Sequence, residues 1–366
     1  MVPFADLRAQ YHSLKREIDD AIARTLESSQ FILGREVEAF ENEFAALHGC
    51  RHGIGVNSGT SALHLALLAA GIGPGHEVIT TPFSFAASAA SILYTGARPV
   101  YVDIDPATYN LDPSRIAAAI TPRTRAIMPV HLFGQAADMD AILKIARHHR
   151  LAVIEDACQA HLAQYKGRPV GSLADVACFS FYPSKNLSAM GEGGAVVTNN
   201  PEIAKQVRLM RNWGMEQRYH HLVRGFNYRM EGFQGAILRV KLQRLAAWTE
   251  TRRSLAAAYT RALSGSGLDL PIEMEWARHV YHVYCVATDH RDELQRQLTA
   301  REIQTMIYYP HPIHFNEPYR DPNFPAGSLP VAERAANRVL ALPIYPEMPE
   351  SAIAEVASAI AVTTPA

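Results

Sequence analysis

Lys185 is the residue whose sequence surroundings most clearly suggest chemistry. It lies in "FSFYPSKNLSAMGEGGAVVT" at 179–198, between an apolar run and a glycine-rich run. Burial lowers the pKa of a lysine, and a neutral amine can form a Schiff base with an aldehyde. The alternative interpretation is an ordinary loop lysine. The other lysines, each in charged or polar sequence surroundings where a solvated face is expected, are Lys15, Lys144, Lys166, Lys205 and Lys241.

Asp156 ends the apolar run "LAVIED" at 151–156. If this run is a parallel strand, its carboxyl end faces the crevice in which open α/β sheets bind ligands. A buried carboxylate is costly without a cationic or hydrogen-bonding partner, and a protonated pyridine nitrogen would be such a partner. The alternative is that Asp156 caps a helix in the following "ACQAHL".

Two further stretches could hold a flat, phosphorylated molecule. In "NSGTSALHLAL" at 57–67, small residues open a predicted helix, whose free N–H groups and dipole suit a phosphate. The stretch matches neither the Walker A motif nor GxGxxG, and many strand-to-helix turns have a similar composition. In "TTPFSFAAS" at 80–88, Phe83 and Phe85 could stack on a flat ring, although core packing is the usual role of such rings.

The four features together predict a cofactor that none of them predicts alone. They are a phosphate cradle, an aromatic ring, a carboxylate for a ring nitrogen and a lysine for an aldehyde. Pyridoxal 5'-phosphate requires these protein groups.

The elements that would position these residues alternate along the first two thirds of the chain. Apolar residues at helical spacing predict one opening helix over residues 4–28. After it, β-rich runs such as "HEVITTP" and "RPVYVDID" alternate with helical stretches, including 138–149 and 201–211. This alternation predicts an α/β domain with a mainly parallel sheet.

The pattern changes near residue 245, after a stretch at 235–260 that predicts one long helix. We therefore expect a large domain at 1–245, which includes the N-terminal helix, and a smaller α+β domain at 246–366. The elements expected in the smaller domain are a strand at 279–288, a helix at 291–301, a Pro- and aromatic-rich loop at 308–330 and a final helix.

Composition excludes several other classes of protein. The net charge is −1, the pI is about 7.0 and no long basic run occurs, so nucleic acid is not an expected partner. The N-terminus lacks the apolar core of a signal peptide, and the longest apolar stretch, at 62–73, is too short to span a bilayer. The four cysteines show no CxxC spacing and are expected to be reduced thiols. A cytoplasmic protein with no membrane contact is expected.

Several blocks of the chain resemble the DegT/DnrJ/EryC1/StrS family, and the resemblance covers nearly the whole sequence. The blocks are "FILGREVEAFENEFA", "GVNSGTSAL", "EVITTPFSFAAS", "VIEDACQAH", "FSFYPSKNL", "GFNYRMEGFQGAIL" and "YPHPIHFNEPYR". Family members are pyridoxal-phosphate-dependent aminotransferases that act on keto sugars, which are usually nucleotide-linked. The resemblance implies fold type I of the pyridoxal-phosphate-dependent transferases, the aspartate aminotransferase-like fold.

The resemblance also implies a role for each matched position. Lys185 resembles the lysine that forms the internal aldimine, and Asp156 resembles the partner of the pyridine nitrogen. Gln159 resembles the group beside the cofactor hydroxyl, and Phe85 the aromatic residue stacked on the ring. The positions that resemble phosphate ligands are Gly59, Thr60, Ser61 and Ser180.

Asn227 resembles an asparagine that reaches the phosphate of the neighbouring subunit, which implies a homodimer with composite sites. Arg211 and Arg229 could meet a diphosphate, although salt bridges would explain them equally well. No carboxylate or cysteine is placed to complete a metal site with the histidines near residue 311, so no metal is expected. The residues expected to line the substrate pocket are Tyr182, Tyr309, His311 and His314.

The expected reaction transfers an amino group, with glutamate as the expected donor, to a keto sugar linked to dTDP, UDP or GDP. Family members that act as dehydratases carry histidine in place of the lysine, so Lys185 favours transamination. The positions that depart from the family pattern without removing a catalytic group are Cys158, Leu162, Ser188 and Glu192. The alternatives are an aminocyclitol aminotransferase, a pyridoxal-phosphate-dependent sugar dehydratase and a non-catalytic regulatory protein.

Overall fold

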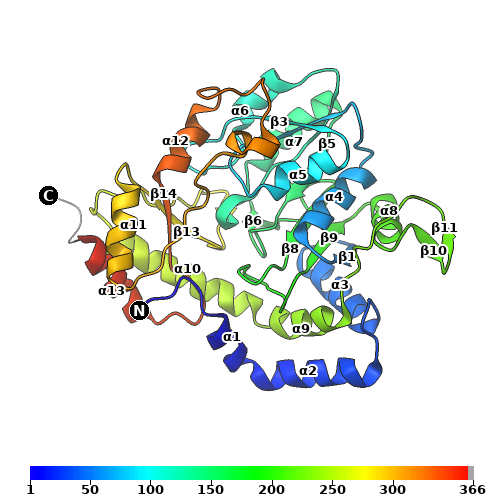
Figure 1. The fold of residues 1–366 in the computed structure, drawn as a ribbon, viewed down its shortest axis with the longest axis horizontal. Coiled ribbons are helices and arrows are strands. Elements are labelled where there is room, and N and C mark those ends of the chain that lie inside the picture. Colours follow the sequence, from blue (N-terminus) through cyan, green and yellow to red (C-terminus); the bar gives the residue numbers. More distant parts are fainter. Residues whose placement is uncertain (362–366) are drawn as a thin grey trace.

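A seven-stranded sheet forms the centre of the larger part of the molecule in the computed structural model, which describes residues 1–361 (Figure 1). The strand order is β1-β9-β8-β5-β4-β2-β3. Only β9 runs in the direction opposite to the other six strands, so the predicted mainly parallel α/β sheet is confirmed. The strands are β1 (His52–Val56), β2 (Glu77–Thr80), β3 (Arg98–Tyr101), β4 (Thr124–Ile127), β5 (Ala152–Asp156), β8 (Val176–Ser180) and β9 (Gly194–Thr198).

Both faces of this sheet are buried because apolar side chains alternate between two clusters. On β8, for example, Ala177 and Phe179 join one cluster, whereas Val176 and Cys178 join the other. A strand sends successive side chains to opposite faces, so a continuous apolar run is typical of a sheet covered on both sides. The helices and short 3₁₀ turns of this part are α3 (Arg35–Leu47), α4 (Gly59–Ala69), α5 (Ala87–Tyr94), α6 (Pro113–Ile116), η1 (Ala117–Ala119), η2 (Leu132–Gly134), α7 (Met139–His149) and α8 (Pro201–Arg211).

The C-terminal part has its own apolar cluster, which lies at the left of Figure 1 beside the N-terminus. A two-stranded antiparallel sheet of β13 and β14 is covered by α10, α11 and α13. The expected domain limit at 245/246 stays a prediction. The elements are α9 (Gly232–Leu242), α10 (Leu245–Ala262), β12 (Ala277–Arg278), β13 (Tyr284–Ala287), α11 (Arg291–Ala300), η3 (Ile313–Phe315), η4 (Glu317–Tyr319), α12 (Pro330–Arg338), β14 (Val339–Leu342) and α13 (Glu350–Ala361).

Two short hairpins complete the fold. β6 (Gln164–Tyr165) pairs with β7 (Arg168–Pro169) and with β12 of the C-terminal part. The hairpin of β10 (Met215–Gln217) and β11 (His220–His221) projects from the right of the molecule in Figure 1.

Two of the predicted long helices are each divided in two. The opening helix is α1 (Leu7–Ser13) followed by α2 (Lys15–Ser28), because Leu14 leaves helical geometry (φ −123°, ψ 12°) and buries its side chain against Ile18 and Ile237. The stretch at 235–260 is interrupted after α9, where the Arg244 N–H bonds to the Lys241 carbonyl (2.9 Å) in a tight turn. Apolar periodicity continues across such one- or two-residue breaks, so it does not reveal them.

The prediction of a single final helix after residue 330 was incomplete. Residues 330–361 contain α12, the strand β14 and α13 rather than one final helix. The strand predicted at 279–288 is paired only over β13, because residues 279–283 leave the sheet and pack against the larger part.

Asp103 links the two parts of the molecule. This buried carboxylate follows β3 and accepts hydrogen bonds from the N–H groups of Val331 (3.0 Å) and Ala332 (2.9 Å). Because these are first-turn groups of α12, the carboxylate also meets the positive end of the helix dipole.

Glu77 anchors the opposite edge of the sheet, where β2 begins. Its side chain is 1% exposed. Its carboxylate forms ion pairs with Arg98 (2.9 Å) and Arg123 (2.7 Å) and accepts a hydrogen bond from the Thr121 hydroxyl. Burial alone would raise the pKa of Glu77, but the hydrogen bonds from Thr121, Arg98 and Arg123 outweigh it and lower the pKa to about 2. Arg98 also pairs with Asp321 (2.8 Å), so the cluster holds the loop that precedes α12.

We predict that Glu77→Gln lowers the free energy of unfolding at pH 7 by about 3 kcal/mol, because it leaves two arginines without their buried partner. The pKa of Glu77 is depressed in the fold, so this stabilisation is present above the ordinary pKa of 4.5 and is lost as the pH falls from there toward 2. Urea unfolding at pH 7 and at low pH measures both effects.

Glu250→Gln is the matched control, since Glu250 pairs with Arg278 on the surface and should change the stability by less than about 1 kcal/mol. Equal effects of the two substitutions would contradict the special role given to Glu77.

Candidate active site

The predicted site residues follow strands that end at one edge of the sheet. β2, β5 and β8 belong to the parallel set, and β1 runs in the same direction as β8 because each is antiparallel to β9. The carboxyl ends of these strands therefore meet at one edge, which is where α/β sheets bind ligands. Segments 57–61, 83–88, 156–159 and 180–185 leave the sheet there.

Gly59 begins α4 in very close contact with the ends of two other strands. A Cβ atom at this position would lie 2.6 Å from Ser180 Cβ and 3.0 Å from Cys158 Sγ, so only glycine fits without displacement. The Ser58 side chain caps the helix by accepting the Ser61 N–H (3.0 Å). Among residues 1–361, no group accepts the N–H of Gly59 or Thr60. These N–H groups and the helix dipole form an anion-binding geometry beside Ser180.

Ser61 differs from the other predicted phosphate ligands. Its side chain is buried, and its hydroxyl lies 2.9 Å from the Ser58 hydroxyl within the helix cap. Its role toward a phosphate stays a prediction.

Asp156 is a buried carboxylate at the end of β5, with 4% of its surface exposed. It accepts hydrogen bonds from the Ser88 hydroxyl at Oδ2 (2.7 Å) and from the Cys158 N–H at Oδ1 (3.2 Å). It forms no ion pair with any residue of the described chain, 1–361. The alternative that Asp156 caps a helix is wrong, because residues 157–162 form turns.

Lys185 lies in the loop that follows β8. Burial lowers the pKa of its amine, and nearby Cys158 and Asp156 oppose that effect. The backbone is fixed by a hydrogen bond from the Lys185 N–H to the Tyr182 carbonyl (2.8 Å). The amine Nζ lies 3.5 Å from Nε2 of His282, a residue that the sequence analysis did not identify.

Lys241 is a second buried lysine, which corrects the expectation of a solvated face. It is 2% exposed on α9 and donates to the Ser188 hydroxyl (3.1 Å). Burial lowers the pKa of Lys241 to about 8, against the opposing charge of Glu347.

Gln159 and Tyr309 are joined by a hydrogen bond from the amide Nε2 to the phenol oxygen (2.9 Å). Gln159 also accepts the Phe133 N–H (2.8 Å), so its side chain is held at both ends. The ring of Phe85 lies 6.4 Å from that of Tyr309 and is 61% exposed, whereas Phe83 packs in the core. An exposed aromatic ring is thus available beside Tyr309.

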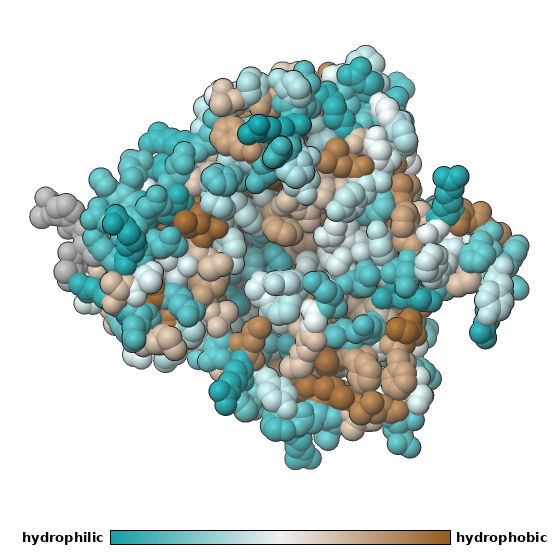
Figure 2. Space-filling view, in the orientation of Figure 1, coloured by the Kyte–Doolittle hydropathy of each residue, from teal (hydrophilic) through white to brown (hydrophobic). Residues whose placement is uncertain are grey.

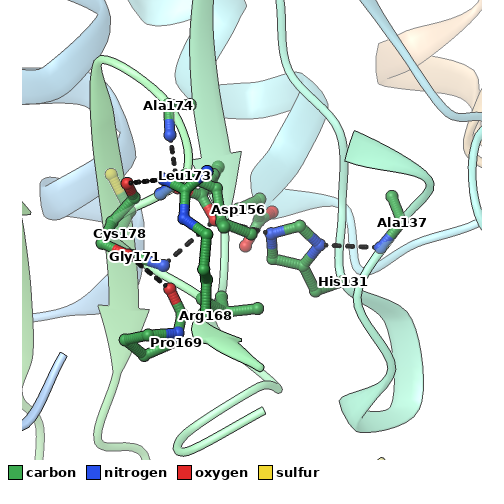
Figure 3. A network of polar contacts seen from close by, with 12 residues as sticks. His131, Ala137, Asp156, Arg168, Pro169, Gly171, Leu173, Ala174 and Cys178 are labelled. Carbon is green, nitrogen blue, oxygen red and sulfur yellow. Dashed lines mark hydrogen bonds and ion pairs between the residues drawn. The ribbon is translucent and has the colours of Figure 1, made fainter. Parts of the chain in front are cut away.

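A polar network behind β5 supports these residues (Figure 3). Glu155 is fully buried and points away from Asp156, because successive strand residues face opposite ways. His131 Nδ1 accepts the Ala137 N–H (3.0 Å), so the proton lies on Nε2, which donates to Glu155 (3.0 Å). The His131 N–H in turn bonds to the Asp156 carbonyl (3.0 Å). The remaining donors to Glu155 are the N–H groups of Gly171, Leu173 and Ala174.

The structure places the other predicted substrate residues in different surroundings. Tyr182 and His311 are exposed. His314 is 2% exposed, with its Nε2 atom 3.5 Å from Glu333 and its ring against Tyr101. The structure does not bring His314 to Lys185, and its contacts account for it as a packing residue.

The two arginines considered for a diphosphate also differ. Arg211 is buried, pairs with Glu41 and donates to the Gly55 carbonyl (2.6 Å), so the salt-bridge interpretation is the correct one for it. Arg229 is half-buried and donates to the Asn227 side-chain oxygen (2.7 Å). Since a guanidinium only donates, the amide N–H₂ of the exposed Asn227 points away from it.

The side chains that sequence reasoning missed are Ser88, Glu155, His131 and His282. The only available signals were the two adjacent carboxylates of "VIED" in a buried strand and the second of the two histidines in "HVYHVY". Among residues 1–361, no cluster of three or more His, Cys, Asp or Glu side chains could hold a metal ion. No helix in that part of the chain is both long and apolar enough to cross a membrane.

The sheet, the site at its carboxyl edge and the smaller C-terminal part place the molecule among the pyridoxal-phosphate-dependent transferases of fold type I. Residues 12–361 match the model of the DegT/DnrJ/EryC1/StrS aminotransferase family, and the chain belongs to this family.

Two relatives and one solved structure show how similar the family members are. A transaminase of Streptomyces venezuelae, named for dTDP-3-amino-3,4,6-trideoxy-alpha-D-glucose, is 48% identical over 348 residues, which cover 95% of this chain and 92% of that protein. A Geobacillus stearothermophilus protein named a pleiotropic regulatory protein is 48% identical over 352 residues, or 95% of each chain. The crystal structure of S. venezuelae DesV in complex with a ketimine intermediate superposes with a TM-score of 0.97, at 46% identity, over 99% of this chain and 98% of that one.

We predict that Gly59→Ala weakens the binding of pyridoxal phosphate about tenfold or more, because the added methyl group would displace Ser180 and Cys158 from the anion-binding geometry. Fluorescence or absorbance titration with the cofactor measures the loss. Gly73→Ala is the control, since a Cβ atom there would meet only the Thr95 carbonyl oxygen, at 4.0 Å. Unchanged affinity in Gly59→Ala would contradict the placement of the phosphate at α4.

Proposed function

We propose that this enzyme uses pyridoxal 5'-phosphate to transfer an amino group from glutamate to a nucleotide-linked keto sugar. One observation carries the proposal. Lys185, an amine with a lowered pKa, lies at the same sheet edge as Asp156, a buried carboxylate that forms no ion pair with any of residues 1–361. Such a pair suits a ligand that brings both an aldehyde and a protonated ring nitrogen.

The residues around this pair fit the cofactor. The free N–H groups at the start of α4, beside the Gly59 contact that excludes any side chain, suit its phosphate. Phe85 offers an exposed ring for stacking, and Gln159 is held where it can meet the ring hydroxyl. Bound pyridoxal phosphate supplies a ring that accepts the electrons left when a proton leaves the neighbouring carbon.

The chain's own residues have separate tasks in this proposal. Lys185 binds the aldehyde covalently at rest and, when released, moves a proton as general base and then as general acid. Asp156 keeps the ring nitrogen protonated, and the Ser88 hydroxyl fixes the direction of its carboxylate. Tyr309 stays a protonated phenol, because burial raises its pKa, and can donate to a bound substrate.

The proposed assembly is a homodimer in which Asn227 serves the neighbouring subunit's phosphate. Its amide donors point outward because Arg229 occupies the side-chain oxygen. Large apolar side chains are also exposed around the connection from α2 to α3, where Phe31 stacks on Phe233 (5.6 Å) and Ile32 is solvent-facing. Figure 2 shows brown side chains gathered over this region and α9. Such patches are uncommon on monomers.

The sugar substrate is proposed from the S. venezuelae relative, whose name specifies a dTDP-linked sugar aminated at position 3. A dTDP-linked 3-keto sugar is therefore the first substrate to assay, with UDP, GDP and 4-keto analogues beside it. The amino position of the product, read by NMR, also separates transamination from dehydration and from action on an aminocyclitol.

A regulatory protein without catalysis is the second candidate, because the G. stearothermophilus relative carries a regulatory name. A regulatory function without catalysis does not need a lysine with a lowered pKa or a buried carboxylate that has no cationic partner. Residues 1–361 of this chain include both, in Lys185 and Asp156. We therefore favour the enzyme.

We predict that Lys185→Ala abolishes the covalent link to pyridoxal phosphate, because the proposal assigns the aldehyde to this lysine alone. The visible absorbance of the desalted, cofactor-loaded protein measures it. The wild type should be yellow, and glutamate should bleach it. Lys205→Ala, on the exposed surface of α8, is the control and should behave as the wild type does. A yellow, glutamate-sensitive Lys185→Ala protein would refute the assignment.

We predict that mixing inactive Lys185→Ala subunits with weakened Asn227→Ala subunits restores activity. Random pairing makes half of the dimers mixed, and each mixed dimer has one intact site of two, so about a quarter of wild-type activity is expected. Sugar turnover after co-refolding or subunit exchange measures the recovery. If Asn227 acts within its own subunit, no mixed dimer has an intact site and activity stays at the level of the separate variants.

A further inference from the structure

The imidazole of His282 lies against the amine of Lys185. Lys185 Nζ and His282 Nε2 are 3.5 Å apart, although the two residues are 97 positions apart in the chain. The other ring nitrogen, Nδ1, has no hydrogen-bond partner among residues 1–361. The His282 ring therefore faces the amine that the proposed function uses and is committed to no other partner in the described chain.

The position of His282 is fixed by the backbone on either side of it. The Val280 N–H donates to the Gly134 carbonyl (3.0 Å), and the Val280 carbonyl accepts the Asn186 side chain (3.0 Å). A Cβ atom on Gly134 would lie 3.1 Å from the backbone nitrogen of His282, so glycine permits the two segments to approach this closely. Because Asn186 follows Lys185 directly, the same contacts fix the position of the lysine loop relative to His282.

The His282 ring is neutral near pH 7. Burial lowers its pKa well below the ordinary value, and the charges of Lys185 and Arg252 lower it further. Arg252 donates to the Tyr281 carbonyl (3.3 Å), one residue before the ring. The other titratable groups that act in the same direction are His161 and His279. When a neutral imidazole carries its proton on Nδ1, its Nε2 atom can accept a hydrogen bond from an amine that faces it.

We propose that His282 is a catalytic residue of the amino transfer, whose neutral imidazole accepts a hydrogen bond from the Lys185 amine and directs its lone pair toward the reacting carbon. This proposal rests on the proposed function, which makes Lys185 the proton carrier. No proton passes to His282, so Lys185 carries the same proton from carbon to carbon. A lysine has four flexible carbons, and holding one N–H group restricts the directions in which the nitrogen can act.

A pair of substitutions with the same amide group and different reach tests the hydrogen bond. His282→Gln can bring its carbonyl oxygen close to the position of Nε2, whereas His282→Asn is one carbon shorter. We expect His282→Asn to lower kcat about 100-fold while KM for the sugar changes less than about twofold, and His282→Gln to recover to within about tenfold of the wild type.

His279→Asn is the matched control. His279 is another buried imidazole three positions earlier, and its Nδ1 accepts the Tyr281 N–H (2.9 Å), which an asparagine oxygen can also do. It should leave kcat unchanged. If His282→Asn does not fold, as judged by near-UV circular dichroism, His282→Phe compared with His282→Gln makes the same test.

A second readout does not depend on the reaction. The pH dependence of Lys185 acetylation, followed by mass spectrometry on the cofactor-free protein, reports the apparent pKa of the amine. A neutral acceptor stabilises the ammonium form, so His282→Asn should shift this pKa downward and His282→Gln should restore it.

Wild-type kcat and an unshifted acetylation profile in His282→Asn would overturn the proposal, and so would equal losses in the Asn and Gln variants, which indicate packing alone. Failure of the proposed function looks different. In that case glutamate does not bleach the wild-type protein loaded with pyridoxal phosphate, and the acetylation profiles alone then decide whether His282 holds Lys185.

Discussion

A buried carboxylate without a cation is the constraint on which the site depends. Asp156 is almost completely removed from water, yet residues 1–361 offer its carboxylate only a serine hydroxyl and one backbone N–H. Those two donors lower the cost of burying the charge but do not neutralise it. A ligand that brings a positive ring nitrogen would complete this arrangement, and the other site residues surround the place where such a ring would lie.

The scaffold holds Asp156 in place from behind. Glu155, the next residue on β5, gathers a histidine side chain and three backbone N–H groups on the opposite face of the sheet. The same histidine bonds to the Asp156 carbonyl through its backbone and begins the loop that also holds Gln159. A polar network in which every group has a partner makes its surroundings rigid. The network around Glu155 therefore fixes the strand end that carries Asp156, while the Asp156 carboxylate remains available to a ligand.

The C-terminal part of the chain contributes directly to the site. Residues 279–283, which precede β13 and are not paired in its sheet, bring His282 to Lys185. Tyr309 reaches Gln159 from a separate loop. Arg98 and Asp103 of the larger part hold the chain that follows Tyr309, at Asp321 and at the start of α12. Folding of the two parts against each other is therefore required to complete the set of groups around Lys185.

The sequence was sufficient for those features that local pattern determines. Asp156 ends an apolar strand and Lys185 follows one, and the rule that parallel strands share their carboxyl edge brings them together without further information. Contacts between distant segments were not accessible in the same way. His282 lies in a run of β-forming residues and was absorbed into a predicted strand, and Lys241 looked solvated because the residues that cover it are remote in sequence. Leu14 interrupts a helical pattern that is periodic on both sides, and its buried side chain packs against Ile237, which is remote in sequence.

Identification of the lysine that binds the cofactor would test the central claim most directly. The protein loaded with pyridoxal phosphate is reduced with borohydride, digested and mapped by mass spectrometry. We expect the pyridoxyl group on Lys185 and on no other lysine, including Lys241, whose lowered pKa makes it the strongest competitor. A label on Lys241 or another lysine, or no label at all, would contradict the assignment of the site.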